Sequence, residues 1–214
     1  MKPLLKSEME SRLATRFGDA IALREKPATE FVSTGLVEID EMTGGLPRGA
    51  ITELLGPASS GRTTLLLASL RAATERDEVF ALVDASDSFD PASAAGADVG
   101  LDRLLWVRCG SDAARALKAV DLLLQSGGFG LVALDLGDIS TAGARRIPSS
   151  WWHRFRRAIE TTPTCLLVIE HEPNARSCAS LALELSNESA TWSMSSSRAR
   201  NTLCAGGKSA TPSA

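Results

Sequence analysis

The stretch LLGPASSGRTTLLL, from Leu54 to Leu67, constrains the fold more than any other part of the chain. An apolar, strand-like run leads into a turn with the spacing G-x-x-x-x-G-x-[ST], and a helical pattern follows it. Such a turn points successive backbone N–H groups into one concavity that suits phosphate oxygens. Gly56 and Gly61 permit backbone angles and a close approach that a Cβ atom would forbid. The spacing therefore predicts a phosphate-binding loop; the alternative is an ordinary strand-to-helix turn of small residues.

This loop supplies the first candidate site. Its nucleotide-binding residues are expected to be Gly56, Pro57, Ala58, Ser59, Ser60, Gly61, Arg62, Thr63 and Thr64. The Thr63 hydroxyl is expected to contact Mg²⁺. Arg62 stands where such a loop normally carries lysine, and its planar fork is bulkier than a lysine ammonium. Arg62 is therefore expected to neutralise phosphate charge but to sit differently against a γ-phosphate.

Short apolar runs alternate with helical segments along the chain from residue 50 onward. Strands are expected over residues 51–55, 79–85, 104–107, 130–136 and 164–170, and helices over residues 62–74, 111–125 and 149–160. The strand runs are apolar throughout, as strands buried on both faces should be. The alternation predicts an α/β fold with a mostly parallel sheet and helices on both faces. Residues 181–185 and 190–194 suggest a small hairpin at one edge.

A core over residues 31–194 is expected between an arm over residues 1–30 and a tail over residues 195–214. The arm has apolar residues at four-residue spacing, which predicts an amphipathic helix. These residues are Leu5, Met9, Leu13, Phe17 and Ile21. The tail is rich in Ser, Ala and Gly and is expected to be disordered.

Composition narrows the function classes. The net charge of -3 gives no global basicity, so contact with nucleic acid would need a local patch. The four cysteines show neither C-x-x-C pairing nor metal-ligand spacing and are interpreted as reduced thiols. The N-terminus lacks the apolar region of a signal peptide, and no apolar run is long enough to span a membrane. The chain is expected to be cytoplasmic.

Several motifs in order resemble the core of RecA-type recombinases. The lead-in and loop STGLVEIDEMTGGLPRGAITELLGPASSGRTT, the segment LVDASDSFDP and the strand GLVALDLGD carry the resemblance, which covers about residues 8–136 and more loosely reaches residue 172. MESRLATRFGDAI resembles the family's N-terminal helix, which packs on the neighbouring protomer of a filament. The resemblance implies a RecA-like P-loop NTPase core with an N-terminal helix arm. ATP and Mg²⁺ are the implied cofactors, and the arm implies a homo-oligomer.

The resemblance also assigns roles and reveals departures. Asp135 takes the metal-side carboxylate position together with Thr63, Asp90 joins the nucleotide-binding residues, and His171 aligns with the γ-phosphate sensor. Ser86 stands where the family has the glutamate that positions the attacking water, and the neighbouring Asp87 is the speculative substitute. At the position of the adenine-stacking tyrosine the chain has Ser93, and the sequence contains no tyrosine. These departures predict weak ATP binding with impaired hydrolysis, because phosphoryl transfer depends on positioning and charge stabilisation. A loop that binds nothing is the alternative.

The segment ARRIPSSWWHRFRR (residues 144–157) lies where RecA-like proteins carry their first DNA-contacting loop. Its arginines are candidate contacts to single-stranded DNA, because guanidinium groups pair with phosphates. They are Arg145, Arg146, Arg154, Arg156 and Arg157. Helical spacing puts Trp151, Phe155, Ala158 and Ile159 on one apolar face with Trp152 near its border, which favours core tryptophans over base stacking.

The second DNA loop of the family is not recognisable after Glu172, and the chain has no room for the family's C-terminal domain. The pattern is closer to the short RecA-like accessory proteins called ImuA. The first hypothesis is therefore an accessory protein of DNA repair and SOS damage tolerance that binds a RecA filament or a translesion polymerase. The alternatives are a DNA-dependent ATPase or recombinase, in which Asp87 and Arg62 replace the usual groups, and a nucleotide-independent module that docks on RecA or a polymerase.

Overall fold

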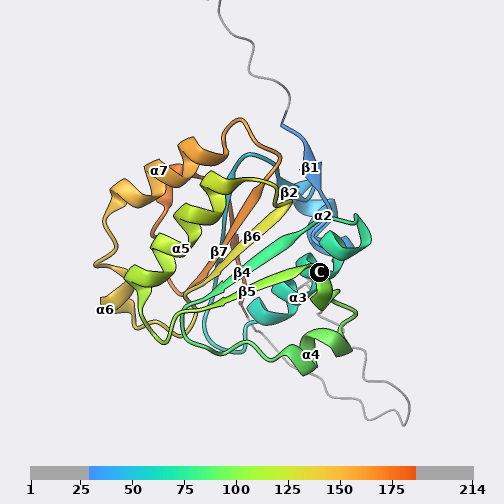
Figure 1. The fold of residues 1–214 in the computed structure, drawn as a ribbon, viewed down its shortest axis with the longest axis horizontal. Coiled ribbons are helices and arrows are strands. Elements are labelled where there is room, and N and C mark those ends of the chain that lie inside the picture. Colours follow the sequence, from blue (N-terminus) through green and yellow to red (C-terminus); the bar gives the residue numbers. More distant parts are fainter. Residues whose placement is uncertain (1–28, 187–214) are drawn as a thin grey trace, which may run out of the picture.

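The computed structural model describes residues 29–186, which form a six-stranded parallel sheet between two layers of helices (Figure 1). In chain order the elements are β1 (Phe31–Val32), α2 (Val37–Thr43), β2 (Leu46–Pro47), β3 (Ile51–Leu55), α3 (Arg62–Glu75), β4 (Phe80–Asp84), α4 (Pro91–Gly96), β5 (Leu104–Arg108), α5 (Ala113–Ser126), β6 (Leu131–Asp135), α6 (Thr141–Ala144), α7 (Ser149–Ile159), β7 (Cys165–Glu170) and β8 (Ala179–Glu184). Short 3-10 turns precede β5 and β8. The sheet has the order β5-β4-β6-β7-β3-β8, and every neighbouring pair is parallel.

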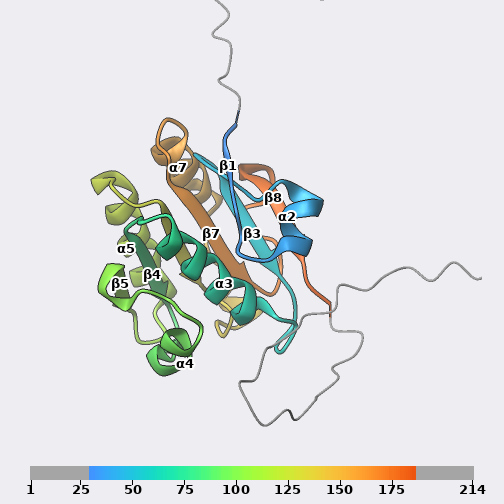
Figure 2. The same cartoon turned by 90° about the vertical axis from the view of Figure 1, so that its right-hand side faces the viewer.

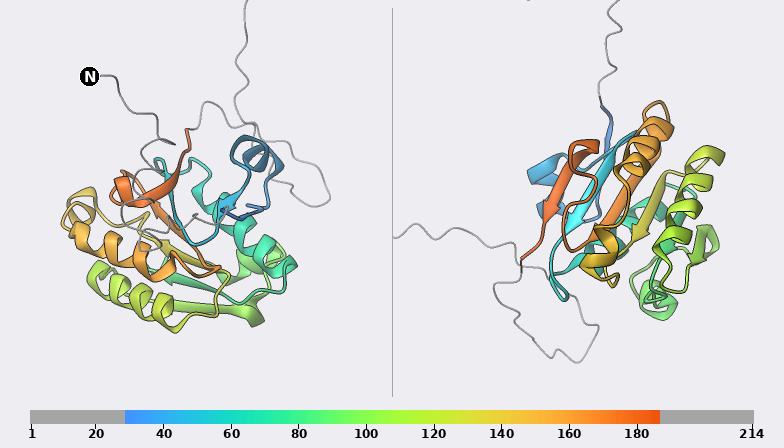
Figure 3. Two further views of the ribbon diagram at one scale, coloured as in Figure 1. Left: turned by 90° about the horizontal axis from the view of Figure 1, so that it is seen from above. Right: turned by 90° about the vertical axis from the view of Figure 1, so that its left-hand side faces the viewer.

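The helices cover both faces of the sheet, as the alternating pattern predicts. Helices α5 and α7 lie side by side on one face (Figure 3), and α3 lies on the other with α4 and α2 nearby (Figure 2). Two apolar clusters fill the space between the sheet and these layers. The predicted α/β fold is confirmed.

The edge strands differ from the expectation. The apolar run of β5 predicts burial on both faces, but β5 is an edge strand, and Leu105 is 45% exposed. Residues 181–185 belong largely to β8, the opposite edge, which pairs in parallel with β3 rather than opening an antiparallel hairpin. The rest of the expected hairpin, residues 190–194, lies outside the described residues, as do the N-terminal helix and the tail.

A small ribbon and helix near the start of the described chain are not expected from the sequence. Strands β1 and β2 pair antiparallel, and α2 lies between them in sequence. Asp40 of α2 fastens this unit, because its carboxylate accepts the Thr34 N–H at 2.8 Å and the Thr34 hydroxyl at 2.7 Å. Thr34 is fully buried, so these bonds satisfy a polar group inside the fold.

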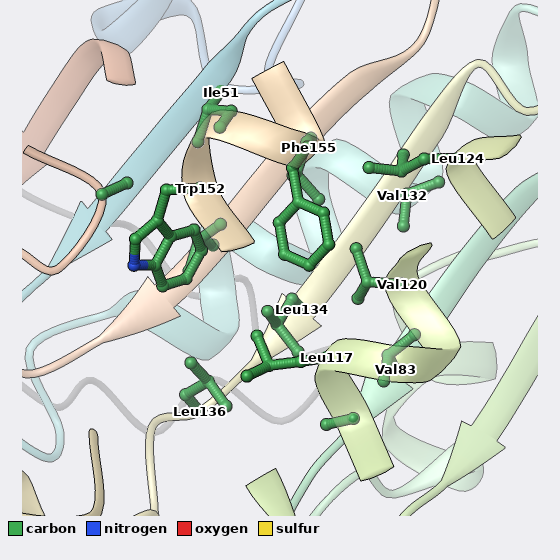
Figure 4. Packing of buried hydrophobic residues seen from close by; sticks show 14 of the residues in the cluster. Ile51, Val83, Leu117, Val120, Leu124, Val132, Leu134, Leu136, Trp152 and Phe155 are labelled. Atoms are coloured by element: carbon green, nitrogen blue, oxygen red, sulfur yellow. The ribbon is translucent and has the colours of Figure 1, made fainter. Parts of the chain in front are cut away.

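Helix α7 packs through the expected apolar face, but that face also includes Trp152. Trp152, Phe155 and Ile159 are its buried residues, and Figure 4 shows Trp152 and Phe155 extending from α7 toward the strands of the sheet. Their spacing is that of one helix face. Trp152, expected at the border, is 1% exposed, whereas Trp151 is only half-buried and lies beside the Arg154 guanidinium. Both tryptophans therefore contribute to packing.

Among the described helices, none is both long enough and apolar enough to cross a lipid bilayer.

Phe155→Ala should destabilise the protein strongly, because Phe155 is fully buried between α7 and the sheet. We expect a loss of about 3–5 kcal/mol in the free energy of unfolding, measured by urea denaturation. Leu122→Ala on α5 is the control, since Leu122 is 69% exposed, and should change stability by less than about 0.5 kcal/mol. Equal losses in the two variants would contradict this account of the core.

Candidate nucleotide-binding site

The glycine-containing loop joins β3 to α3 and has a tightly closed backbone. Gly61 adopts a left-handed conformation with φ 100°, immediately before the first residue of α3. A Cβ atom at Gly56 would lie 2.5 Å from Ser60 Oγ and 2.6 Å from the Leu185 carbonyl, so only glycine fits there. Within residues 29–186, the buried Ser60 hydroxyl has no hydrogen-bond partner. The strand, turn and helix expected around this motif are all present.

Arg62 is the first residue of α3, and its side chain folds inward. It is 8% exposed, and its Nη1 atom is buried without a hydrogen-bond partner among the described residues. The guanidinium lies over Gly137, since a Cβ atom at that glycine would be 3.3 Å from Nη1. Burying a charged donor without an acceptor is costly. This position therefore favours an anionic ligand.

Two carboxylates end neighbouring strands beside Arg62. Asp84 of β4 and Asp135 of β6 are register partners, so their side chains emerge at the same edge of the sheet. Asp84 is 1% exposed and accepts the N–H groups of Ser88 and Phe89 at 3.1 and 2.9 Å, which fixes the loop after β4. Burial raises the pKa of Asp135 to about 6; nearby Asp84 adds to this rise, and the Arg62 cation opposes it.

A cavity of about 300 Å³ brings these groups together. Its lining includes Arg62, Thr63, Asp90, Ser93, Asp135 and Asp138. Four of these, Arg62, Thr63, Asp90 and Asp135, are predicted site residues that come from three separate segments. Asp138 was not predicted, although it follows Asp135 by three residues in the quoted GLVALDLGD strand. The Arg62 guanidinium, which lines this cavity, fits a phosphate ligand.

Comparison with known proteins identifies the family. A family model, RecA N-terminal domain, matches residues 9–142. The chain belongs to the RecA family.

Curated relatives are longer than this RecA-family chain. Protein RecA of Borrelia hermsii is 30% identical over 171 residues, which is 71% of this chain and 48% of that protein. Protein RecA of Methylococcus capsulatus is 40% identical over 122 residues, which is 56% of this chain and 34% of that protein. The chain thus spans about half the length, or less, of the curated relatives it matches. A crystal structure of the RadB recombinase shares the fold, with a TM-score of 0.56 and 21% identity, and covers 69% of this chain and 73% of that one.

Asp90 and Ser93 of this RecA-family chain lie at the N-terminal end of α4. Asp90 caps the helix, because its carboxylate accepts the N–H groups of Ala92 and Ser93 at 3.2 and 3.0 Å and the Ser93 hydroxyl at 2.5 Å. The hydrogen bonds from Ser93 lower the pKa of Asp90. Its nucleotide-binding role stays a prediction. A nucleobase that donated to Asp90 would share carboxylate oxygens that already accept hydrogen bonds from Ala92 and Ser93.

Asp87, the speculative catalytic base, points to a different set of partners. Its carboxylate accepts from Arg108 Nη2 at 3.2 Å and from the Gly110 N–H at 3.3 Å. It lines neither of the two cavities around the loop. The Ser86 hydroxyl, at the position of the family's glutamate, is buried and unpartnered within the described chain. Asp87 is therefore engaged away from both cavities, and its role as a base stays a prediction.

His171 lies beside the start of the loop, as the sensor assignment requires. It lines a second cavity, of about 540 Å³, together with Gly56, Pro57, Glu172 and Asp138. Asp138 therefore lines both cavities, so the loop that follows β6 borders each of them. The γ-phosphate role of His171 remains a prediction.

The arginine segment divides into engaged and free side chains. Arg145 makes a bidentate pair with Glu172, with contacts of 2.8–3.0 Å, and Arg154 of α7 donates to Asp121 of α5 at 2.6 Å. The remaining arginines are exposed and form no ion pair with another described residue. They are Arg146, Arg156 and Arg157. The free arginines are the better placed for phosphate contact.

A buried pair of glutamates beneath the loop was not predicted from the sequence. Glu53 of β3 and Glu170 of β7 are each 1% exposed. Burial raises the pKa of Glu170 to about 8, and its hydrogen bond with Glu53 adds to the rise. Glu53 also accepts the Ala175 N–H at 2.6 Å, which anchors the segment after β7. The only sequence signal is an acidic residue inside each apolar strand.

Glu170→Gln should flatten the pH dependence of stability between about pH 6.5 and 8. The raised pKa means that the folded protein keeps a proton that the unfolded chain has already lost, so stability falls as pH rises toward 8. The slope due to Glu170 should approach about 1.4 kcal/mol per pH unit. Thermal or urea unfolding across this range measures it. Glu172→Gln, which changes a half-exposed neighbour, should keep the slope, and an unchanged slope in Glu170→Gln would refute the raised pKa of Glu170.

Proposed function

We propose that this chain is a DNA-repair accessory protein that holds ATP in the loop between β3 and α3 and hydrolyses it weakly or not at all. The observation that carries the proposal is the Arg62 side chain, buried beside the loop with Nη1 unpartnered among the described residues. A bound phosphate oxygen would recover the free energy lost by burying that donor. Arginine suits this role because its planar fork can donate parallel hydrogen bonds to phosphate.

Impaired hydrolysis follows from the groups near the loop. The attacking water needs an oriented acceptor, and a serine hydroxyl such as that of Ser86 cannot act as a base at neutral pH. Asp87 is held by Arg108 and Gly110 instead. These contacts favour a nucleotide-holding protein over the alternative, a DNA-dependent ATPase or recombinase that uses Asp87.

We infer a role beside other repair proteins from family membership combined with the altered reactive groups. A RecA-type fold that does not turn over ATP can still bind partners, and the partners we propose are a RecA filament or a translesion polymerase of the SOS response. The N-terminal residues 1–30 supply the proposed contact for self-assembly, by similarity to the family's filament helix. A cytoplasmic location is part of the same proposal.

ATP should raise the thermal stability of the protein, because a ligand that binds only the folded state stabilises it by about 2.7 kcal/mol at roughly one hundred times its Kd. Arg62→Ala should weaken ATP binding about tenfold or more, since a hydrogen bond to a charged group contributes about 1.5–3 kcal/mol. Arg71→Ala, also on α3 but outside both cavities, is the matched control.

Thermal unfolding and steady-state phosphate release separate the candidate functions. An absence of any ATP-induced shift at saturation would favour the nucleotide-independent interaction module. Brisk hydrolysis stimulated by single-stranded DNA would instead favour the ATPase or recombinase.

Single-stranded DNA is proposed to contact the exposed arginines of α7. The double substitution Arg156→Ala and Arg157→Ala should weaken binding to an oligonucleotide and reduce the salt dependence of log K by about 0.7 for each phosphate that is no longer neutralised. Fluorescence anisotropy at several salt concentrations measures both effects. Arg103→Ala, outside the segment, should leave the slope unchanged, and an unaltered slope in the double variant would exclude these residues from the interface.

A further inference from the structure

We propose that Arg62 is the resident cation of the nucleotide site, in place of the Mg²⁺ ion expected between Thr63 and Asp135, so that nucleotide binds without a divalent metal. This inference rests on the proposed function, because it concerns the same loop and the same ligand. It replaces the assignment of Thr63 and Asp135 as metal-binding residues.

The first observation is where the guanidinium lies. A Cβ atom at Gly137 would be 3.3 Å from Arg62 Nη1, 3.4 Å from Arg62 Cζ and 3.0 Å from Asp135 Oδ1. The cation and the carboxylate therefore border the same small space above Gly137. Arg62 thus reaches from the phosphate loop to the end of β6.

The second observation is the unused hydrogen-bonding capacity of this cation. Arg62 is more than nine-tenths buried, yet Nη1 has no partner and forms no ion pair with Asp135 or any other described residue. An arginine with a purely structural role would be expected to satisfy its buried donors within the protein. Arg62 lines the cavity of about 300 Å³, so a phosphate bound there would lie beside its guanidinium.

The third observation concerns the metal. Mg²⁺ demands near-octahedral oxygen ligands and keeps several waters, and in phosphate loops it lies between the loop hydroxyl and the strand carboxylate. Here that region adjoins a fixed guanidinium, so a divalent ion would meet a like charge in a partly buried space. The donor set fits a guanidinium–phosphate contact better than a hydrated metal.

A permanent side-chain cation can perform part of what Mg²⁺ does in such sites. It neutralises phosphate charge and separates the phosphates from Asp135, and its fork donates directional hydrogen bonds. It cannot exchange ligands or release with the product, as a metal can. The arrangement therefore suits retention of a nucleotide rather than its turnover.

The test compares the affinity for ATP carrying a fluorescent ribose label in excess EDTA and in excess Mg²⁺. For the unaltered protein the Kd in Mg²⁺ should be no more than about threefold lower than the Kd in EDTA. Arg62→Lys restores the ordinary loop residue and should bind at least about tenfold more tightly in Mg²⁺ than in EDTA. Arg71→Lys makes the same exchange on α3 outside the cavity and should behave like the unaltered protein.

A reciprocal measurement needs no variant. If Mg²⁺ does not help the protein bind nucleotide, linkage requires that the protein does not help nucleotide bind a divalent metal. Protein-bound nucleotide should therefore bind Mn²⁺ no more than about threefold more tightly than free nucleotide does. Electron paramagnetic resonance of free Mn²⁺ measures both affinities. Binding that appears only with Mg²⁺, or a large gain in Mn²⁺ affinity, would overturn this inference and leave the proposed function standing. An absence of nucleotide binding under both conditions would overturn the proposed function and the inference with it.

Discussion

Parallel pairing of four buried strands is the constraint on which the site depends. Strands β4, β6, β7 and β3 are neighbours in the sheet and are covered on both faces, so their polar groups can reach a ligand only where the strands end. The register brings Asp84 beside Asp135 and sets Leu55, the last residue before the loop, beside Glu170. A ligand at this edge therefore meets groups from several strands at once, as is usual for open α/β sheets.

Under the proposed function, this edge of the sheet binds a triphosphate without hydrolysing it. A phosphate loop needs backbone donors, a cation and a shape that admits the ligand; the structure shows a tightly closed turn at Gly56, the buried Arg62 and a cavity beside it. Turnover needs in addition an oriented water, and this chain has a serine hydroxyl at that position. Because holding and splitting a triphosphate depend on different groups, the first can persist without the second.

The sequence predicts the features of this molecule that depend on local patterns, such as apolar runs between turns. The bounds expected for β3 match the structure, and those of the other central strands agree closely, because long apolar runs between turns are local signals. The order of the strands, the exposure of β5 and the burial of Trp152 depend on contacts between distant segments, which periodicity does not encode. The same reason explains the site: the motif predicted Arg62 and Asp135, but not the inward path of the arginine or the burial of Glu53 beside Glu170.

The arginine segment shows how composition can mislead about a surface. Five arginines suggest a uniform basic patch, yet Arg145 ties the end of α6 to Glu172 after β7, and Arg154 ties α7 to α5 through Asp121. The Arg145 pair spans the two segments that follow β6 and β7, and those segments also border the cavity that holds His171 and the start of the phosphate loop. A phosphate that competed with Glu172 for Arg145 would release this tie next to the nucleotide site.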